Sequence, residues 1–203
     1  MDPATPPLTF RVDYPDRALN RWTTAFRLIL AIPVLIVIGL LTGRVGPDFG
    51  IGGPLTLLFL PTLLLIVVRQ KYPRWWFDFA LHLLRFDARI LSYLYLLRDE
   101  YPSVDEEQAI HLDVDYPDAA GDLNRWMPLV KWILAIPHYI ILVVLHIAAA
   151  VVAVIAWFAI LFTGRYPKGM FDFVVGVLRW NFRVVAYAFL LATDRYPPFT
   201  LRE

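Results

Sequence analysis

Cysteine is absent from the 203 residues of the chain. This absence excludes a disulfide scaffold, a thiolate zinc site, an iron–sulfur cluster and thiol catalysis. Charge is also scarce, because only 18% of the residues are charged and the net charge is +1. A nucleic-acid-binding protein needs a broad basic surface, so nucleic acid is excluded as a partner. Intrinsic disorder is excluded too, since it requires low hydrophobicity and high charge.

Apolar residues are the component in excess. They make up 59% of the chain, against about 45–50% in a typical soluble domain. Seven tryptophans and ten tyrosines supply rings of the kind that anchor at a membrane–water interface. The first 18 residues are polar and proline-rich and lack the apolar core of a cleavable signal peptide. We therefore predict a multi-pass protein of the inner (plasma) membrane, with membrane lipids as its first partners.

The sequence contains an internal repeat. Blocks that recur in the same order are Val12-Asp13-Tyr14-Pro15-Asp16 with Val114-Asp115-Tyr116-Pro117-Asp118, Leu19-Asn20-Arg21-Trp22 with Leu123-Asn124-Arg125-Trp126, Leu30-Ala31-Ile32-Pro33 with Leu134-Ala135-Ile136-Pro137, and Phe77-Asp78-Phe79 with Phe171-Asp172-Phe173. Chance does not produce so many ordered matches, so we predict a tandem repeat. The two membrane repeats are residues 6–104 and 108–200. Between Asp99 and Asp122 the chain carries nine acidic residues and no Lys or Arg, as expected of a hydrophilic joint.

Each repeat opens with an alternating segment. Residues 8–14 and 110–116 place apolar side chains at every second position, which predicts short strands that are buried on one face. The two strands could pair with each other across the repeats and form a small sheet outside the membrane. The alternative is two unpaired extended segments.

Apolar helices follow each strand. Residues 19–41 are long enough to cross a hydrocarbon core of roughly 30 Å, and residues 55–68 form a second, shorter apolar stretch. In the second repeat, residues 129–162 are one apolar run of 34 residues, either a tight hairpin or an amphipathic piece followed by one tilted helix. The distribution of Arg and Lys places loop 43–54 outside and both termini in the cytoplasm. This favours two crossings in each repeat and hence the hairpin.

The third segment of each repeat is amphipathic. Between Arg74 and Leu97 the polar residues Asp78, His82, Arg85, Arg89 and Ser92 share one helical face, and Asp172, Arg179 and Arg183 share a face in the second copy. A helix with central charges is a poor transmembrane span, so we predict two interfacial helices. Their arginines Arg85, Arg89, Arg179 and Arg183 would bind anionic lipid headgroups. The alternatives are a polar stripe buried in the bundle and salt bridges to Asp78, Asp87 or Asp172.

Candidate chemical groups are few. His138 and His146 are eight residues apart, near one helical face, and could bind a metal or haem, but interhelical hydrogen bonds are the better interpretation. Asp78 and His82 are one helical turn apart and resemble an acid–base pair, but the second repeat has Gly176 in place of His82. The sequence contains no phosphate loop and no catalytic triad motif. We therefore predict no catalytic residues, no metal site, no cofactor and no enzymatic activity.

The strongest family resemblance lies in the second repeat. Its segments Leu134-Ala135-Ile136-Pro137-His138, Thr163-Gly164-Arg165-Tyr166-Pro167, Arg183-Val184-Val185-Ala186-Tyr187 and Asp194-Arg195-Tyr196-Pro197-Pro198-Phe199 resemble the bacterial membrane family DUF4389, a domain of unknown function. The resemblance extends over nearly the whole chain as two tandem copies. The first copy departs from it, with Val34 where the motif has His138. The resemblance implies an integral membrane protein and no catalytic residues.

These observations predict an all-α membrane protein. Its fold is a tandem repeat of a helical hairpin plus an amphipathic interfacial helix, with short strands before each repeat. We expect an accessory or scaffold subunit, or an anionic-lipid-interacting protein. Its partners are membrane lipids, with other membrane protein subunits or a second copy of itself as further candidates. A small transporter or channel is the first alternative. A membrane anchor that binds a metal or haem through His138 and His146 is the second.

Overall fold

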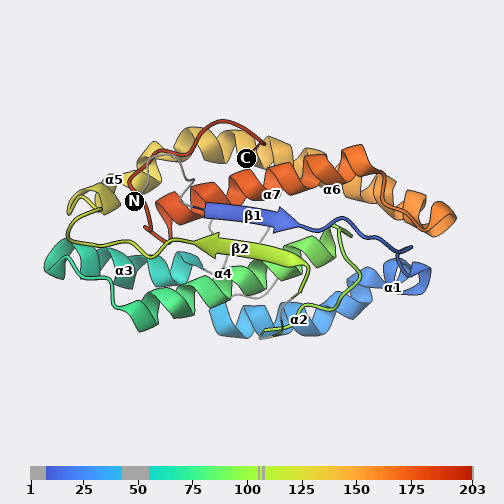
Figure 1. Ribbon diagram of the computed structural model, residues 1–203, viewed down its shortest axis with the longest axis horizontal. Coiled ribbons are helices and arrows are strands. Elements are labelled where there is room, and N and C mark those ends of the chain that lie inside the picture. Colours follow the sequence, from blue (N-terminus) through green and yellow to red (C-terminus); the bar gives the residue numbers. More distant parts are fainter. Residues whose placement is uncertain (1–7, 43–54, 105, 107, 203) are drawn as a thin grey trace.

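The computed structural model describes residues 8–42, 55–104, 106 and 108–202, and its elements are shown in Figure 1. The predicted outer loop 43–54 therefore lies outside the described residues. In the part of the chain that is described, the fold is mostly helical with two short strands, as the sequence predicted. The elements, in chain order, are β1 (Leu8–Val12), α1 (Arg21–Ala25), α2 (Arg27–Thr42), α3 (Leu55–Arg69), α4 (Arg74–Leu94), β2 (Ile110–Val114), α5 (Met127–Leu134), α6 (Ile136–Thr163) and α7 (Lys168–Ala188).

The two strands pair with each other. β1 and β2 form an antiparallel sheet in which Phe10 lies opposite Leu112, so the predicted pairing across the two halves is confirmed. Alternate side chains of both strands are buried, as the period of two requires. The register is also symmetric, because Leu8 pairs with Val114 and Val12 pairs with Ile110. Exchanging corresponding residues of the two halves leaves this pairing unchanged, so a local two-fold axis passes between Phe10 and Leu112.

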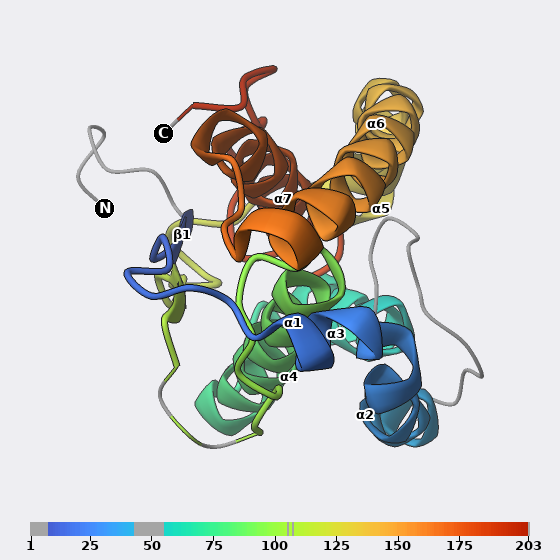
Figure 2. The same cartoon turned by 90° about the vertical axis from the view of Figure 1, so that its right-hand side faces the viewer.

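Each strand lies on the long helix of the other half. β1 contacts α7, and β2 contacts α4. Behind this pair of helices, α6 packs on α7, and α2 and α3 pack on α4. Figure 2 shows the resulting layers, with the strands on one side, α4 and α7 in the middle, and α6 and α2 farthest from the strands. The long helices run roughly parallel to the strands (Figure 1).

The long apolar run of the second half is not a hairpin. It consists of the short α5 and the 28-residue α6. The predicted helical hairpin is therefore wrong, and the alternative of a short amphipathic piece followed by one long helix is right. The physical reason is that residues 138–162 contain no Gly, Pro, Asn or Asp to form a turn. Pro137 at the start of α6 separates it from α5, and Gly164, with φ 74°, ends α6 in the left-handed conformation.

Only α6, among the described helices, is long and apolar enough to cross a membrane. The apolar helices α2 and α3 are shorter. This result agrees with membrane association, but one such helix does not establish a multi-pass topology.

Candidate functional site

The predicted lipid-binding arginines Arg85 and Arg179 hold the two strands. Arg85 Nε donates to the carbonyl oxygen of Leu112 at 2.8 Å, and Arg179 Nε donates to that of Phe10 at 3.1 Å. These two carbonyls belong to the central residue pair of the sheet. Arg85 also forms an ion pair with Asp113, at 2.6 Å. Around Arg85 and Arg179 the polar faces of α4 and α7 are therefore covered by the sheet, a contact that the sequence analysis did not predict.

Arg89 and Arg183, one turn further along each helix, hold the segments that follow α4 and α7. Arg89 Nη1 donates to the carbonyl oxygen of Ser103 at 2.7 Å, and Arg183 Nη2 donates to that of Thr200 at 2.6 Å. Both side chains are buried. Burial and the neighbouring Arg179 lower the pKa of Arg183. The predicted alternative of a buried polar stripe describes this geometry, while lipid binding by the four arginines stays a prediction.

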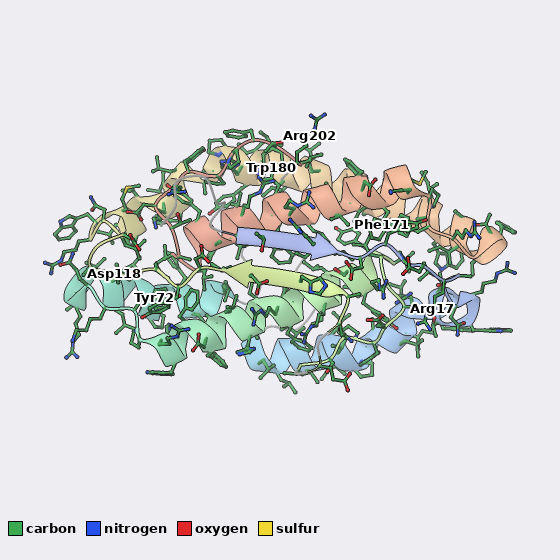
Figure 3. All side chains as sticks on the ribbon, in the orientation of Figure 1. Arg17, Tyr72, Asp118, Phe171, Trp180 and Arg202 are labelled. Atoms are coloured by element: carbon green, nitrogen blue, oxygen red, sulfur yellow. The ribbon has the colours of Figure 1, made fainter. Side chains whose placement is uncertain are left out.

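Two tyrosines join the halves at opposite ends of the sheet. The phenol of Tyr14 donates to the carbonyl oxygen of Tyr166 at 2.5 Å, and the phenol of Tyr116 donates to the carbonyl oxygen of Tyr72. The rings of Tyr14 and Phe171 also meet edge to face, with 5.0 Å between their centroids. Figure 3 labels Tyr72 and Phe171, which lie toward opposite ends of the molecule. These tyrosines, each of which is followed by a proline, thus join the two halves of the chain.

Two buried cations were missed by the sequence analysis. Arg27 and Lys131 occupy corresponding positions in the two halves, and their exposed fractions are 2% and 0%. Arg27 Nη1 donates to the carbonyl oxygen of Arg98 at 2.8 Å, and Lys131 Nζ donates to that of Thr193 at 2.7 Å. Burial lowers the pKa of Lys131. The signal was available, because a basic residue recurs 104 positions apart inside otherwise apolar helices.

The two candidate histidines have different partners. Trp180 Nε1 donates to His138 Nδ1 at 3.0 Å, and the Tyr95 hydroxyl lies 3.0 Å from His146 Nδ1. The first joins α7 to α6, and the second joins Tyr95, the residue that follows α4, to α6, in agreement with the preferred interpretation of hydrogen bonds between helices. The His138 ring also stacks on Phe199, with 4.0 Å between centroids. Within the described ranges, no group of three or more His, Asp or Glu side chains is placed to hold a metal ion.

The Asp78–His82 pair lies on the exposed side of α4. Asp78 is 3.8 Å from Arg74, one turn earlier on the helix. His82 is exposed. The two side chains are therefore not enclosed in a pocket that could exclude water from a reaction.

The most extensive feature of the surface is apolar. Large apolar side chains are exposed along α1, α2, α3, α5 and α6, and they include Trp22, Phe26, Leu28, Ile29, Leu40, Leu60, Val68, Trp126, Trp132, Ile140, Val144, Val151, Phe158 and Phe162. Soluble monomers rarely expose contiguous apolar patches larger than a few hundred Å². Larger exposed patches are typical of sites that contact a membrane or another protein.

Comparison with known proteins gives one match. None of the curated proteins and none of the solved structures is significantly similar to the chain. Residues 125–200, within the second predicted repeat, match the model of the family described as domain of unknown function DUF4389, which supports the predicted family for one copy of the unit.

Proposed function

We propose that the protein is a non-enzymatic, lipid-interacting component of the plasma membrane, acting as an accessory or scaffold subunit. The observation that carries this proposal is the exposed apolar surface of α1, α2, α3, α5 and α6. The sheet on the opposite side exposes Thr9, Arg11, His111 and Asp113, which suit water or headgroups. Lipids are the first partners, and a second copy or another membrane subunit could share the apolar surface.

We also propose that the molecule is a tandem duplication, with units at 6–104 and 108–200. The symmetric strand register supports this, because corresponding residues exchange places in the pairing. Corresponding hydrogen bonds support it further. Arg85 and Arg179 make equivalent bonds to the two strands, and Tyr14 and Tyr116 make equivalent bonds to the other half. The axis that relates the units is perpendicular to the sheet. If the sheet lies flat on the membrane, this axis runs along the membrane normal, as the repeated order of segments predicts.

In our proposal, α6 lies along the membrane. It packs side by side with α7, and both run roughly parallel to the strands (Figures 1 and 2). If α6 crossed the bilayer, α7 would cross with it and carry Arg179 and Arg183 toward the bilayer centre, at a cost of about 2.5–3.5 kcal/mol each on the insertion scale. A flat orientation avoids this cost. It places α4 and α7 near the interface and the apolar helices below it, in the cytoplasmic leaflet.

The length of α6 agrees with the flat orientation. At about 1.5 Å per residue its 28 residues extend for roughly 42 Å, longer than a hydrocarbon core of roughly 30 Å. One side of the helix is covered by α7, and lipid would cover the remaining sides. The competing topology from the charge distribution has multiple crossings, with loop 43–54 outside and both termini in the cytoplasm.

Single cysteines test the orientation, because the chain has none of its own. Cysteines at Val144, Val151 and Phe158, all exposed on α6, would carry spin labels whose depth is measured in vesicles. We expect equal depths for a flat helix, whereas a crossing helix would spread the three labels over up to about 21 Å. As a second measurement, Gly50→Cys should resist an impermeant maleimide in intact cells. Labelling of that cysteine would establish the multi-pass topology instead.

A high-salt wash of native membranes tests the membrane assignment itself. We expect the protein to stay in the membrane fraction, because its apolar surface rather than its net charge of +1 holds it there. Recovery of the folded protein in the aqueous fraction, without detergent, would contradict the proposal.

A further inference from the structure

An apolar hollow of about 480 Å³ lies between α1, the start of α2, the end of α4 and α6. Its lining includes Leu94, Leu96, Ala153 and Trp157, while Phe26 and Phe158 belong to the exposed apolar surface at its edge. This volume is within the range of roughly 300–1,000 Å³ of ordinary ligand pockets. The hollow therefore adjoins the surface that we assign to lipid.

Two buried polar residues lie in the wall of this hollow, and both have covered side-chain atoms without a hydrogen-bond partner. Arg27 has no hydrogen-bond partner for Nε or Nη2, and Thr24 has none for Oγ1. Both residues are almost fully buried, with exposed fractions of 2% and 0%. Tyr93 and Asp99 stabilise the charge of Arg27 electrostatically. Its Nε and Nη2 nevertheless have no acceptor in hydrogen-bond geometry in the described part of the chain, and buried donors of this kind are costly.

The orientation of Arg27 defines the acceptor. Its Nη1 is held by the carbonyl oxygen of Arg98, and its Cζ lies 4.0 Å from the centroid of the Tyr93 ring. The two unused nitrogens form one edge of the planar guanidinium. An edge of this kind binds two oxygens of a carboxylate or phosphate side by side.

The corresponding site of the second half contains its own anion. Lys131 Nζ lies 2.7 Å from Asp194 Oδ1, so the buried cation is neutralised within the protein. In the first half, the corresponding carboxylate, Asp99, accepts instead from Arg17 Nη2 at 3.2 Å and from the backbone N–H of Asn20 at 3.4 Å. The first half thus leaves the guanidinium edge of Arg27, which is covered but lies in the wall of the hollow, without an acceptor.

We propose that this hollow binds an anionic lipid. The oxyanion of the lipid, a carboxylate or a phosphate, accepts hydrogen bonds from Arg27 Nε and Nη2 and from the Thr24 hydroxyl. Its acyl chain lies in the apolar hollow between α1 and α6, in contact with Ala153 and Trp157. The inference rests on the proposed lipid-interacting function and names the lipid class and the residues that recognise it.

Binding of the fluorescent fatty acid cis-parinarate to the purified full-length protein, in non-ionic detergent, tests the proposal. R27Q should weaken binding by at least about tenfold, because it removes a charge-assisted, two-point contact. R21Q is the matched control: it removes an exposed arginine of α1 that does not line the hollow, and should change the affinity by less than about twofold.

A second pair of variants keeps the guanidinium. A153F fills the hollow and should also weaken binding by at least about tenfold, whereas A150F, exposed on the same helix, should not. If R27Q does not fold, as judged by thermal unfolding, A153F against A150F still decides the outcome. Wild-type affinity in a folded A153F would overturn the proposal, as would wild-type affinity in a folded R27Q.

Competition identifies the source of the oxyanion. Palmitate that displaces the probe indicates a fatty-acid carboxylate, and phosphatidate that displaces it more tightly indicates a phospholipid phosphate; both support the site. Hexadecanol has the same chain without a charge and should compete at least about tenfold less well than palmitate. Equal competition by hexadecanol would overturn the role of Arg27. Failure of the probe to bind a protein that resists the salt wash refutes this inference alone, whereas loss of the protein in that wash refutes the proposed function.

Discussion

The phenol of Tyr14 donates a hydrogen bond to the backbone carbonyl of Tyr166, 152 positions further along the chain, at 2.5 Å. At the other end of the sheet Tyr116 makes the corresponding bond to Tyr72. In both cases a tyrosine that follows a strand of one half holds the Tyr-Pro turn that precedes the long helix of the other half. The two halves are therefore interlocked at both ends of the sheet, and neither half makes these contacts alone.

Removing the Tyr14 hydroxyl should weaken this interlock. We expect Y14F and Y116F each to lower the free energy of unfolding by about 1 kcal/mol, because a net protein hydrogen bond contributes about 0.5–1.5 kcal/mol. The two sites lie at opposite ends of the sheet, so their effects should add in the double variant. Thermal or denaturant unfolding in detergent provides the measurement. Y101F, at an exposed tyrosine, serves as the control, and an equal effect there would contradict the assignment.

The arginines of α4 and α7 should act first as structural residues. We expect R179Q to cost about 1.5–3 kcal/mol of stability, because its charged donor holds the Phe10 carbonyl of β1. R74Q, at the exposed pair with Asp78, should cost less than about 1 kcal/mol. Unfolding of both variants is compared in neutral and in anionic micelles.

Unfolding in neutral and anionic micelles, together with the amount of anionic lipid that is retained on purification, tests the lipid-binding prediction for Arg85, Arg89, Arg179 and Arg183. If these side chains bind headgroups, replacing all four by Gln leaves a folded protein that retains less anionic lipid on purification. If their contacts with backbone carbonyls hold the fold, the variant fails to fold in neutral and anionic micelles alike. The second outcome would exclude lipid binding as their main role.

The sequence predicts the local structure well and the layering poorly. The alternation in residues 8–14 and 110–116 predicted the strands, and their apolar faces required a partner, which each strand finds in the long helix of the other half. The hairpin predicted in residues 129–162 was wrong because residues 138–162 contain no Gly, Pro, Asn or Asp, so the helix continues without a turn whatever the charges at its two ends. Local periodicity could not show that the polar stripe of α4 and α7 faces the sheet, because a strand and a headgroup layer both offer oxygen acceptors to arginine.

Sequence reasoning also missed the candidate lipid site, for a different reason. Arg27 and Lys131 are single charges in apolar helices, and their correspondence is visible only when the two halves of the sequence are aligned. What distinguishes them is the carboxylate: Asp194 is directed to Lys131, whereas Asp99 is directed to Arg17. That difference depends on side-chain geometry, which the nearly identical sequence blocks do not encode in any visible pattern.

Buried tyrosines should make the fold sensitive to alkaline pH. Burial raises the pKa of Tyr95 to about 12 and also raises the pKa values of Tyr72 and Tyr166. At a pH below about 10, the pKa of tyrosine in the unfolded chain, the phenols are protonated in both states, and the contribution of the buried tyrosines to stability is fully present. As the pH rises through about 10 to 12, the unfolded chain releases phenolic protons that the folded protein retains, so stability falls.

Thermal unfolding between neutral pH and pH 11.5 measures this effect. We expect Y95F to be less stable than the wild type at neutral pH, because it loses the hydrogen bond to His146. Above pH 10 its free energy of unfolding should decline less steeply than that of the wild type, by up to about 1.4 kcal/mol per pH unit. Y101F, at an exposed tyrosine, should keep the wild-type slope. An unchanged slope in Y95F would show that its ionisation is not linked to folding.

The buried pair of Lys131 and Asp194 should couple more strongly than the exposed pair that the corresponding carboxylate of the first half, Asp99, forms with Arg17. Lys131 is fully enclosed, so D194N leaves an unpaired buried ammonium group and should cost about 3–5 kcal/mol. K131M should cost less, because Asp194 is partly exposed and still accepts the N–H of Asn124. The double variant should then be more stable than the sum of the two single effects predicts, by about 1–3 kcal/mol. The same double-mutant cycle at Arg17 and Asp99, where Arg17 is largely exposed, should give a coupling of about 0–1 kcal/mol. Equal coupling in the two cycles would mean that Lys131 is hydrated in solution. It would also remove the contrast between Lys131, which forms a direct ion pair with Asp194, and Arg27, for which the described residues provide no direct ion pair.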